Sequence, residues 1–377
     1  MINGDRIRQA REIAGLTQSQ LADALGVTQA HVALFEQNLR QPQDSTLQSI
    51  AFATKFPVAF FRREASPDFP LGSLLYRRRK SMGSKDRERV RQSGKLIFEA
   101  IMHMADRFKK IDLRLPRLTG VDPEEAARIT RTDLGFSPDT PIVHLMSRLE
   151  KNGVVIAVIP YEIEEYDAFS VWADTDPKTP AIVLSNGKPG DRQRWNVAHE
   201  LAHLVLHFSY TGSPSDLDHQ ADRFAGEFLL PEQAVREILE ARPLTLTALA
   251  ELKSQWGVSM QAWIMRAFQL GIITDGQRRY LFRQMAAKEW LRNEPVPIPP
   301  EHPRLLRRLA EELYGQTFDV RRIAELVDGP AHMFRSIVDS YASASDLRGA
   351  PVIKKRALAV SGGGLVTMRR RVESSEG

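Results

Sequence analysis

The chain has 377 residues, of which 42% are hydrophobic and 26% are charged, and it contains no cysteine. Its length predicts two or three domains with real cores. The lack of cysteine excludes a disulfide framework and a cysteine-rich structural zinc site. No apolar run in the sequence reaches the roughly 20 residues of a membrane helix, and the first residues lack the apolar core of a signal peptide. We therefore expect a cytoplasmic protein that makes no membrane contact.

The charge balance is mildly basic, with a formal net charge of +5 and a pI near 9.4. This balance permits nucleic-acid binding without requiring it. The positive charge is uneven, with clusters of Lys and Arg at residues 77–80, 304–308 and 369–371. Such clusters are more often solvated faces or tails than binding sites.

Two short helical patterns near the N-terminus are separated by a tight turn. Gly26 can end the first helix in the left-handed conformation, and Thr28 is a good N-cap for the second. This spacing is typical of a helix-turn-helix. Exposed positions of the second helix, which include Gln29 and His31, carry side chains that can reach base edges in the major groove. The alternative is a small helical docking domain without a role in DNA binding.

Three segments of this module carry a resemblance. They are Arg6-Ile7-Arg8-Gln9-Ala10-Arg11, Gly15-Leu16-Thr17-Gln18-Ser19-Gln20-Leu21-Ala22 and Gly26-Val27-Thr28-Gln29. Together they resemble the Cro-type (XRE family) helix-turn-helix, over residues 4 to about 66. The resemblance implies a DNA-binding domain at residues 1–66, with Gln18, Thr28, Gln29 and His31 as base or phosphate contacts. Where that family often has a basic residue late in the third helix, this chain has Phe35-Glu36-Gln37. A homodimer is consistent with such domains, which often read two half-sites.

The remaining pattern predicts a multidomain chain: an all-α helix-turn-helix domain, then an α+β zincin-like peptidase domain, then a mostly α C-terminal region. Residues 67–122 form a basic connector with a long amphipathic helix at about 86–111. Residues 123–275 form the α+β domain with a small antiparallel sheet. Its expected helices are 123–134, 142–151, 194–207, 220–229, 231–242, 245–255 and 260–270, and its expected strands are 154–159, 169–173 and 180–185. Residues 276–377 are predicted to be helical, with a flexible tail and no assigned role.

The most informative segment is His199-Glu200-Leu201-Ala202-His203, which lies in an apolar helical run without Gly or Pro. Residues four apart on a helix share one face and lie about 6 Å apart along the axis, so both imidazoles can reach one metal ion. Glu200 then lies beside the metal and can take a proton from water. The pattern predicts a zinc ion (Zn2+), or alternatively Mn2+, held by His199 and His203 with Glu200 as the base.

The alternative is a pair of core histidines that other groups satisfy. The flanking residues Val197, Ala198 and Leu201 predict a largely buried helix. Two His and one Glu at the centre of such a helix are costly without partners. A metal ion supplies that partner, which favours the metal site.

A catalytic zinc takes three protein ligands and keeps one open position. The candidates after His203 are His207, Asp216, Asp218, His219, Asp222 and Glu227. The helix that follows has a buried face that includes Ala221, and Asp218 points to the same side of the helix. Asp222 lies one turn further on. This geometry predicts Asp218 as the third ligand and Asp222 as a carboxylate that orients a ligand histidine.

Two histidines stay open as alternative ligands, namely His207 and His219. His207 lies one turn beyond His203 on the same face of the motif helix. The interpretation favoured for His207 is a residue that supports the site from outside the ligand set, as Asp222 does, and hydrogen-bonds the following loop.

Two sequence blocks carry a second resemblance. They are His199-Glu200-Leu201-Ala202-His203-Leu204-Val205-Leu206-His207 and Gln220-Ala221-Asp222-Arg223-Phe224-Ala225-Gly226-Glu227-Phe228-Leu229-Leu230-Pro231. With the preceding strands, over about residues 125–270, they resemble the ImmA/IrrE family of metallopeptidases. That family often has E-x-x-A-[N/D]-x-F-A in the second block, with the Glu as third ligand. This chain has Asp218 there, and Asp is shorter by one methylene, so its helix must approach the motif helix more closely.

The second resemblance implies a zinc endopeptidase that cleaves a transcriptional repressor in response to stress. Combined with the helix-turn-helix, it predicts a DNA-binding regulator whose peptidase acts on a partner repressor or on itself. Glu200 passes the proton to the leaving amine, and Tyr210, Arg223 or the metal stabilises the oxyanion. The strand at 169–173 is a candidate for aligning the substrate by strand addition. The alternative is a transcription factor or antitoxin-like binding protein whose zincin fold is a non-catalytic sensor or scaffold.

Overall fold

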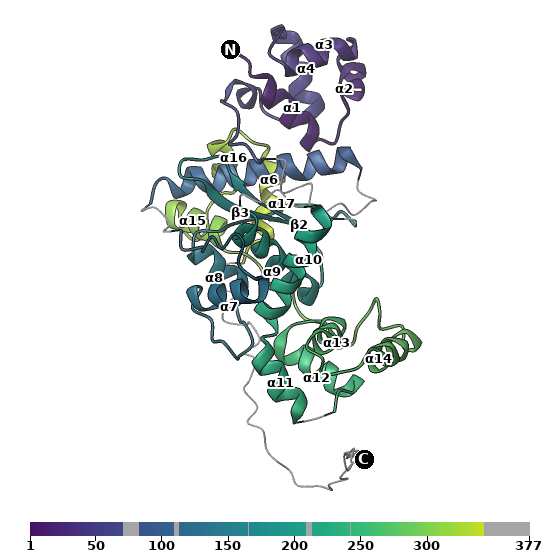
Figure 1. Cartoon of the computed structure of the whole chain (residues 1–377). Coiled ribbons are helices and arrows are strands. Elements are labelled where there is room, and N and C mark those ends of the chain that lie inside the picture. The colour runs from purple at the N-terminus through teal and green to yellow at the C-terminus, as the bar shows by residue number, and fades with distance from the viewer. Residues whose placement is uncertain (71–82, 109–112, 165, 209–212, 242, 343–377) are drawn as a thin grey trace, which may run out of the picture.

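The computed structural model describes residues 1–70, 83–108, 113–164, 166–208, 213–241 and 243–342 (Figure 1). The predicted flexible tail lies outside these residues, as do Tyr210 and the basic clusters at 77–80 and 369–371. Within the described part of the chain, no helix is both long and apolar enough to cross a membrane. The architecture confirms the predicted class, because a helical N-terminal domain precedes a small sheet with flanking helices and a helical remainder.

The N-terminal domain is helical and contains the predicted tight turn. Its elements are α1 (Gly4–Ile13), α2 (Gln18–Leu25), α3 (Gln29–Glu36), α4 (Asp44–Thr54) and the 3-10 helix η1 (Val58–Arg62). Gly26 ends α2 with a φ of 65°, a left-handed conformation that suits glycine. Thr28 caps α3, since its hydroxyl accepts a hydrogen bond from the His31 N–H. Both features match the turn expected from the sequence.

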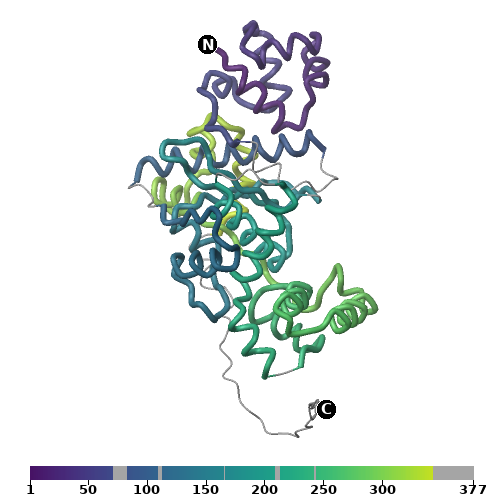
Figure 2. The backbone as a smooth tube through the Cα atoms, in the orientation of Figure 1, coloured from purple at the N-terminus to yellow at the C-terminus, as the bar shows by residue number. Residues whose placement is uncertain are grey.

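The long helix α6 (Ser84–Ala105) runs between the N-terminal domain and the sheet (Figures 1 and 2). It contacts α1 on one side and β1 on the other. Gly94 allows a close approach to the neighbouring strand at 179–184, because a Cβ atom at Gly94 would lie 2.7 Å from Cγ2 of Val183. The helix ends at Ala105, earlier than the predicted residue 111.

A buried ion pair joins the N-terminal domain to α6. The guanidinium of Arg6 donates two hydrogen bonds to the carboxylate of Glu99, at 2.8 and 2.7 Å. The hydroxyl of Ser66 donates a third, at 2.7 Å, and Arg63 adds a fourth, at 3.3 Å. Arg63 also pairs with Asp328 at 3.0 Å, so the same cluster reaches the C-terminal region.

The sheet has the predicted strands in a different arrangement from the one expected. Its strands are β1 (Val155–Val158), β2 (Ala168–Ala173) and β3 (Thr179–Leu184), in the order β1-β3-β2. β2 and β3 are antiparallel, but β1 and β3 are parallel, so the sheet is mixed and the expectation of an antiparallel sheet is corrected. The physical reason is that the hairpin places β3 between β1 and β2, and β1 therefore pairs with a strand of its own direction.

Four helices surround the motif, which lies on one of them, α9 (Gly190–Leu206). The other three are α7 (Pro123–Asp133), α8 (Leu145–Lys151) and α10 (Pro214–Leu229). α9 lies against β2 and β3, and α10 packs against both α9 and α7. α10 begins at Pro214, six residues before the predicted start at Gln220. Asp218 is consequently a helical residue, which fixes its direction toward α9.

The remaining helices fall into two groups. The first group is α11 (Glu232–Glu240), α12 (Leu246–Trp256), α13 (Met260–Gln269) and α14 (Asp275–Ala287). The second group, α15 (Leu305–Tyr314), α16 (Arg321–Leu326) and α17 (Ala331–Asp339), returns to the sheet, where α15 and α16 contact α6 (Figure 1). The hydroxyl of Tyr341 donates a 2.7 Å hydrogen bond to the carbonyl of Ile156 in β1. The C-terminal region therefore packs on the same core as the sheet.

Candidate metal centre and nucleic-acid interface

The centre of α9 brings the two motif histidines together inside the protein. His199 and His203 are 4% and 7% exposed, and their Nε2 atoms lie 3.2 Å apart. The helical spacing of four residues places both rings on one face of α9, as the sequence predicted. Their Nε2 atoms can therefore approach one ion from the same side.

Asp218 of α10 completes a group of three ligand atoms. Its Oδ1 lies 3.7 Å from Nε2 of His199 and 3.6 Å from Nε2 of His203. All three ligand atoms lie within 4.8 Å of one another. Oδ1 is buried and accepts no hydrogen bond from the described residues. A buried carboxylate oxygen that faces two imidazole nitrogens fits a divalent cation, and two nitrogens with one oxygen suit zinc.

Each histidine is held from behind by another side chain. Nδ1 of His199 donates a 2.8 Å hydrogen bond to Oδ1 of Asp222. Nδ1 of His203 lies 2.8 Å from Nδ1 of His207, and Nε2 of His207 lies 3.4 Å from Oε1 of Gln220. His207 thus lies behind the candidate ligand His203, and residues 209–212 of the following loop lie outside the described residues.

The contacts through Gln220 favour one tautomer for each of these two histidines. The amide oxygen of Gln220 can only accept, so Nε2 of His207 carries the hydrogen that it donates. Nδ1 of the neutral His207 is then the acceptor for the Nδ1–H of His203. This tautomer leaves the lone pair of His203 Nε2 directed at the site, as a metal ligand requires.

The local electrostatics favour the same protonation states. Burial lowers the pKa of His203, and burial together with the nearby His203 lowers the pKa of His207 to about 4. Both rings are therefore neutral near neutral pH. Two neutral imidazoles and one carboxylate are the forms that bind a metal.

Glu200 lies on α9 next to His199 and is 2% exposed. The hydroxyl of Ser170 in β2 donates a 2.8 Å hydrogen bond to Oε2 of Glu200. Neither Ser170 nor Gln220 was singled out from the sequence. A serine inside an otherwise apolar strand is the signal that could have marked Ser170.

The structure places the other candidate ligands outside the group of three. His219 is exposed, and Asp216 accepts a hydrogen bond from Ser213 at the start of α10. Glu227 is buried, where it pairs with Arg266 and Arg128. The predicted oxyanion donor Arg223 pairs with Glu124 and Asp122 on the far side of α10. Tyr210 lies outside the described residues.

The predicted DNA contacts lie together on α2 and α3. Nε2 of Gln29 donates a 2.7 Å hydrogen bond to Oε1 of Gln18. The hydroxyl of Thr28 lies 3.2 Å from Nδ1 of His31. Thr28 and Gln29 are exposed, and Gln18 and His31 are half-buried, so the four side chains form one polar edge.

Glu36, which stands where a basic residue is often found in the resembling family, does not belong to that edge. It is 1% exposed, and its carboxylate accepts hydrogen bonds from Arg11 and from Gln18. Its negative charge is therefore neutralised within the domain and does not face a DNA phosphate. Glu36 instead holds Gln18 beside Gln29.

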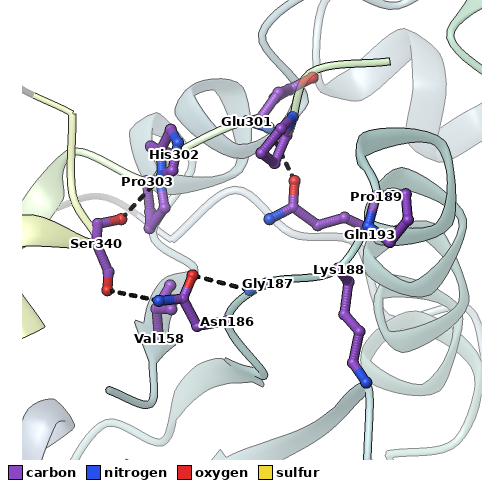
Figure 3. Close-up of a pocket in the computed structure, with 11 residues that line it drawn as sticks. Val158, Asn186, Gly187, Lys188, Pro189, Gln193, Glu301, His302, Pro303 and Ser340 are labelled. Atoms are coloured by element: carbon purple, nitrogen blue, oxygen red, sulfur yellow. Dashed lines mark hydrogen bonds between the residues drawn. The ribbon is translucent and has the colours of Figure 1, made fainter. Parts of the chain in front are cut away.

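A separate cavity of about 290 Å³ opens at the carboxyl ends of β1 and β3 (Figure 3). Its polar groups are largely used within the protein: Asn186 accepts from the Gly187 N–H, and Gln193 accepts from the Glu301 N–H. The ammonium of Lys188 donates to the carbonyls of Ile163 and Glu164. None of the predicted site residues lines this cavity.

The fold and the site define a helix-turn-helix protein with a buried two-histidine, one-aspartate cluster on paired helices. Residues 7–61 match the family model described as helix-turn-helix, and residues 149–268 match the one described as IrrE N-terminal-like domain. The chain therefore joins an N-terminal region similar to helix-turn-helix domains to a region similar to the IrrE-like metallopeptidases.

Curated relatives match the two parts separately. The radiation response metalloprotease IrrE of Deinococcus radiodurans is 27% identical over 169 residues, which is 40% of this chain and 48% of the relative. Uncharacterized HTH-type transcriptional regulators of Sinorhizobium medicae and Rhizobium meliloti are each 34% identical over 65 residues, which is 17% of this chain and 47% of each relative. The chain thus spans about half the length of the curated relatives it matches.

Proposed function

We propose that this chain is a DNA-binding regulator with a zinc-dependent endopeptidase, which cleaves a repressor-type protein in a stress or gene-control response. The substrate is either a partner repressor or the chain itself. The observation that carries the proposal is the meeting of His199 Nε2, His203 Nε2 and Asp218 Oδ1 within 4.8 Å of one another. We assign these three residues as the ligands of one Zn2+ per chain and Glu200 as the catalytic base. The similarity to a protein named a radiation response metalloprotease supports the assignment.

The chain supplies most of the chemistry through Glu200. A bound zinc ion would polarise the scissile carbonyl and lower the pKa of a water molecule. Glu200 takes the proton that this water loses and transfers it to the leaving amine. Ser170 holds one oxygen of that carboxylate through the 2.8 Å hydrogen bond and so fixes the direction of proton transfer.

We place the substrate beside strand β2, all six residues of which are buried. In the order β1-β3-β2, β2 is an edge strand of the described sheet, and it carries Ser170 beside Glu200. An extended peptide that adds to β2 would run past the ligand group, with main-chain hydrogen bonds supplying affinity. This placement favours an extended protein segment as substrate over a small molecule.

The decisive experiment compares Glu200→Gln with Glu240→Gln, a matched change at an exposed position of α11. Peptides from cells that express each form are identified by mass spectrometry, and zinc content and DNA binding are measured on the purified proteins. We expect Glu200→Gln to keep zinc and DNA binding while cleavage falls by about 10²–10⁴-fold. The control should cleave normally.

Two outcomes would redirect the proposal. Normal cleavage by Glu200→Gln would exclude the assigned mechanism. A wild-type chain that retains zinc and binds DNA but yields no cleavage product would instead support a non-catalytic sensor or an antitoxin-like binding protein.

For the N-terminal domain we propose that Gln18, Thr28, Gln29 and His31 contact DNA, with a homodimer reading two half-sites. The polar edge that these residues share is the supporting observation. Fluorescence anisotropy with genomic fragments would test it. Gln29→Ala should weaken specific binding by about 1–3 kcal/mol if Gln29 reads an adenine, and should leave nonspecific binding unchanged.

A further inference from the structure

A second cavity lies where three parts of the chain meet. Its volume is about 310 Å³, at the lower end of the range of roughly 300–1,000 Å³ for small-molecule pockets. The N-terminal domain contributes the ends of α1 and α4, the core contributes α6 and the segment after β1, and the C-terminal region contributes α17. Ile13, Lys55, Arg89, Tyr161 and Pro330 are among the residues that line it. A ligand here would touch all three parts at once.

The charge of this cavity has one sign. Lys55, Arg89 and His332 line it, and no Asp or Glu is among its lining residues. None of the three forms an ion pair with another described residue, although acidic residues are common elsewhere on the surface. A cavity that gathers basic side chains without acidic partners is complementary to an anion.

Arg89 is held in place by the walls of the cavity. Its Nε donates a 3.2 Å hydrogen bond to the carbonyl of Ile13, and its guanidinium carbon lies 4.1 Å above the ring of Tyr161. The two terminal nitrogens of Arg89 make no hydrogen bond within the described part of the chain. A guanidinium fixed in this way is ready to donate both terminal nitrogens to a carboxylate.

The remaining walls add one more positive element and an apolar surface. No side chain caps the N-terminus of α17, which begins after Pro330 at the cavity, so its partial positive charge is not neutralised locally. Ile13, Phe56 and Met333 are buried apolar residues that line the same space. The fitting ligand therefore has an anionic head and a small apolar body.

We propose that this cavity is a binding site for a small organic monocarboxylate, whose binding alters how the helix-turn-helix domain is held against α6 and α17. The ligand would bridge Lys55 of the N-terminal domain and Arg89 of the core. Binding that involves both parts strengthens their contact and so biases the position of the DNA-binding domain. This site is independent of the proposed peptidase, because no residue assigned to the metal centre lines the cavity.

The test uses the full-length protein and titration calorimetry with benzoate and hexanoate as probes. The neutral controls are benzamide and hexanamide, which keep the apolar body and lose the charge. We expect at least one carboxylate to bind one-to-one with a Kd below about 1 mM, and at least tenfold more tightly than its amide. Absence of binding by both carboxylates, or equal binding of acid and amide, would overturn the proposal.

Variants locate the site. Lys55→Asn removes a charge while keeping a residue that tolerates the left-handed conformation found at Lys55, where φ is 62°. Arg89→Gln removes the second charge, and Ser336→Trp fills the cavity. Arg335→Gln is the matched control, because Arg335 is exposed on the same helix but does not line the cavity.

We expect each charge variant to weaken carboxylate binding about tenfold, Ser336→Trp to abolish it, and the control to bind as the wild type does. Should Arg89→Gln fail to fold, as judged by circular dichroism, Lys55→Asn decides the result alone. Unchanged binding by Lys55→Asn and Ser336→Trp would place the ligand elsewhere and refute the site. Hydrogen exchange provides the second readout: the carboxylate should increase protection at the end of α4 and the start of α17, whereas unchanged protection in both would refute the proposed coupling.

Discussion

Two buried polar clusters in this protein are built in opposite ways. Between α1 and α6, the guanidinium of Arg6 meets the carboxylate of Glu99, so each charge has an opposite partner. Between α9 and α10, the two imidazoles of His199 and His203 and the carboxylate of Asp218 all present electron pairs to one another. The first cluster is complete by itself and joins two parts of the chain. The second cluster is complementary to a cation. A binding site therefore differs from a purely structural contact in that several electron-pair donors converge on one point, and burial alone does not distinguish the two.

The largest expected difference between the two clusters is in the stability lost when one partner is removed. Glu99→Ala leaves Arg6, which is 2% exposed, as a buried charge without its main partner, and should destabilise the protein by about 3–5 kcal/mol. Asp218→Ala in metal-free protein removes a half-exposed carboxylate that makes no hydrogen bond through Oδ1 to described residues, and should cost less than about 1 kcal/mol. Urea denaturation of metal-free protein measures both. Equal losses would mean that the Asp218 cluster is also a structural joint.

The second largest effect should be a loss of stability in acid, caused by protonation of Glu99 in the Arg6–Glu99 cluster. Burial opposes ionisation of Glu99, but the nearby His103 and the hydrogen bonds from Arg6 and Ser66 outweigh it and lower its pKa from 4.5 to about 2. Because the folded pKa is below the unfolded one, the contribution is present above pH 4.5 and is lost as the pH falls toward 2. It is on the order of 3 kcal/mol. Wild type should therefore lose more stability than Glu99→Gln over this range, and parallel pH profiles would contradict the assignment.

A smaller effect is expected from the support behind His203. Gln220→Leu removes the acceptor for His207 Nε2 and with it the constraint on the His203 tautomer. Loss of such outer contacts typically weakens metal binding by about 10–100-fold. Competition with a chelator of known affinity measures the change, and Gln233→Leu, at an exposed position of α11, is the control. A zinc affinity equal to that of wild type would mean that His207 orients His203 without help from Gln220.

The sequence could predict the parts of the candidate metal centre that lie on single helices. His199, Glu200 and His203 follow from a spacing of four residues, and Asp218 follows from its position relative to the buried face of α10. Ser170 could not be found in the same way, because its contact with Glu200 depends on how β2 packs against α9. That packing is tertiary and leaves no periodic signal in either element.

The same limit explains the strand arrangement and the charge of α3. Alternation and apolar runs located the strands, but they do not say which strands are neighbours, and β3 lies between the other two. Glu36 looked like an acidic residue on a DNA-binding helix. Its direction is set by packing against α1, where Arg11 pairs with it. The local sequence pattern predicts a helix or strand, but the role of its polar residues depends on the helix or strand against which it packs.

The smallest expected effect tests whether Asp222 supports zinc binding by orienting the His199 ring or through its negative charge. Asp222 accepts a 2.8 Å hydrogen bond from Nδ1 of His199, yet its side chain is 54% exposed, so solvent screens its charge. Asp222→Asn keeps an oxygen acceptor at the same position and should reduce zinc affinity by less than about tenfold. Asp222→Leu removes the acceptor and should cost more. If both variants lose zinc affinity equally, the negative charge of Asp222 matters rather than the orientation of the His199 ring. Asp222 would then have to be counted with Asp218 among the charges that attract the cation.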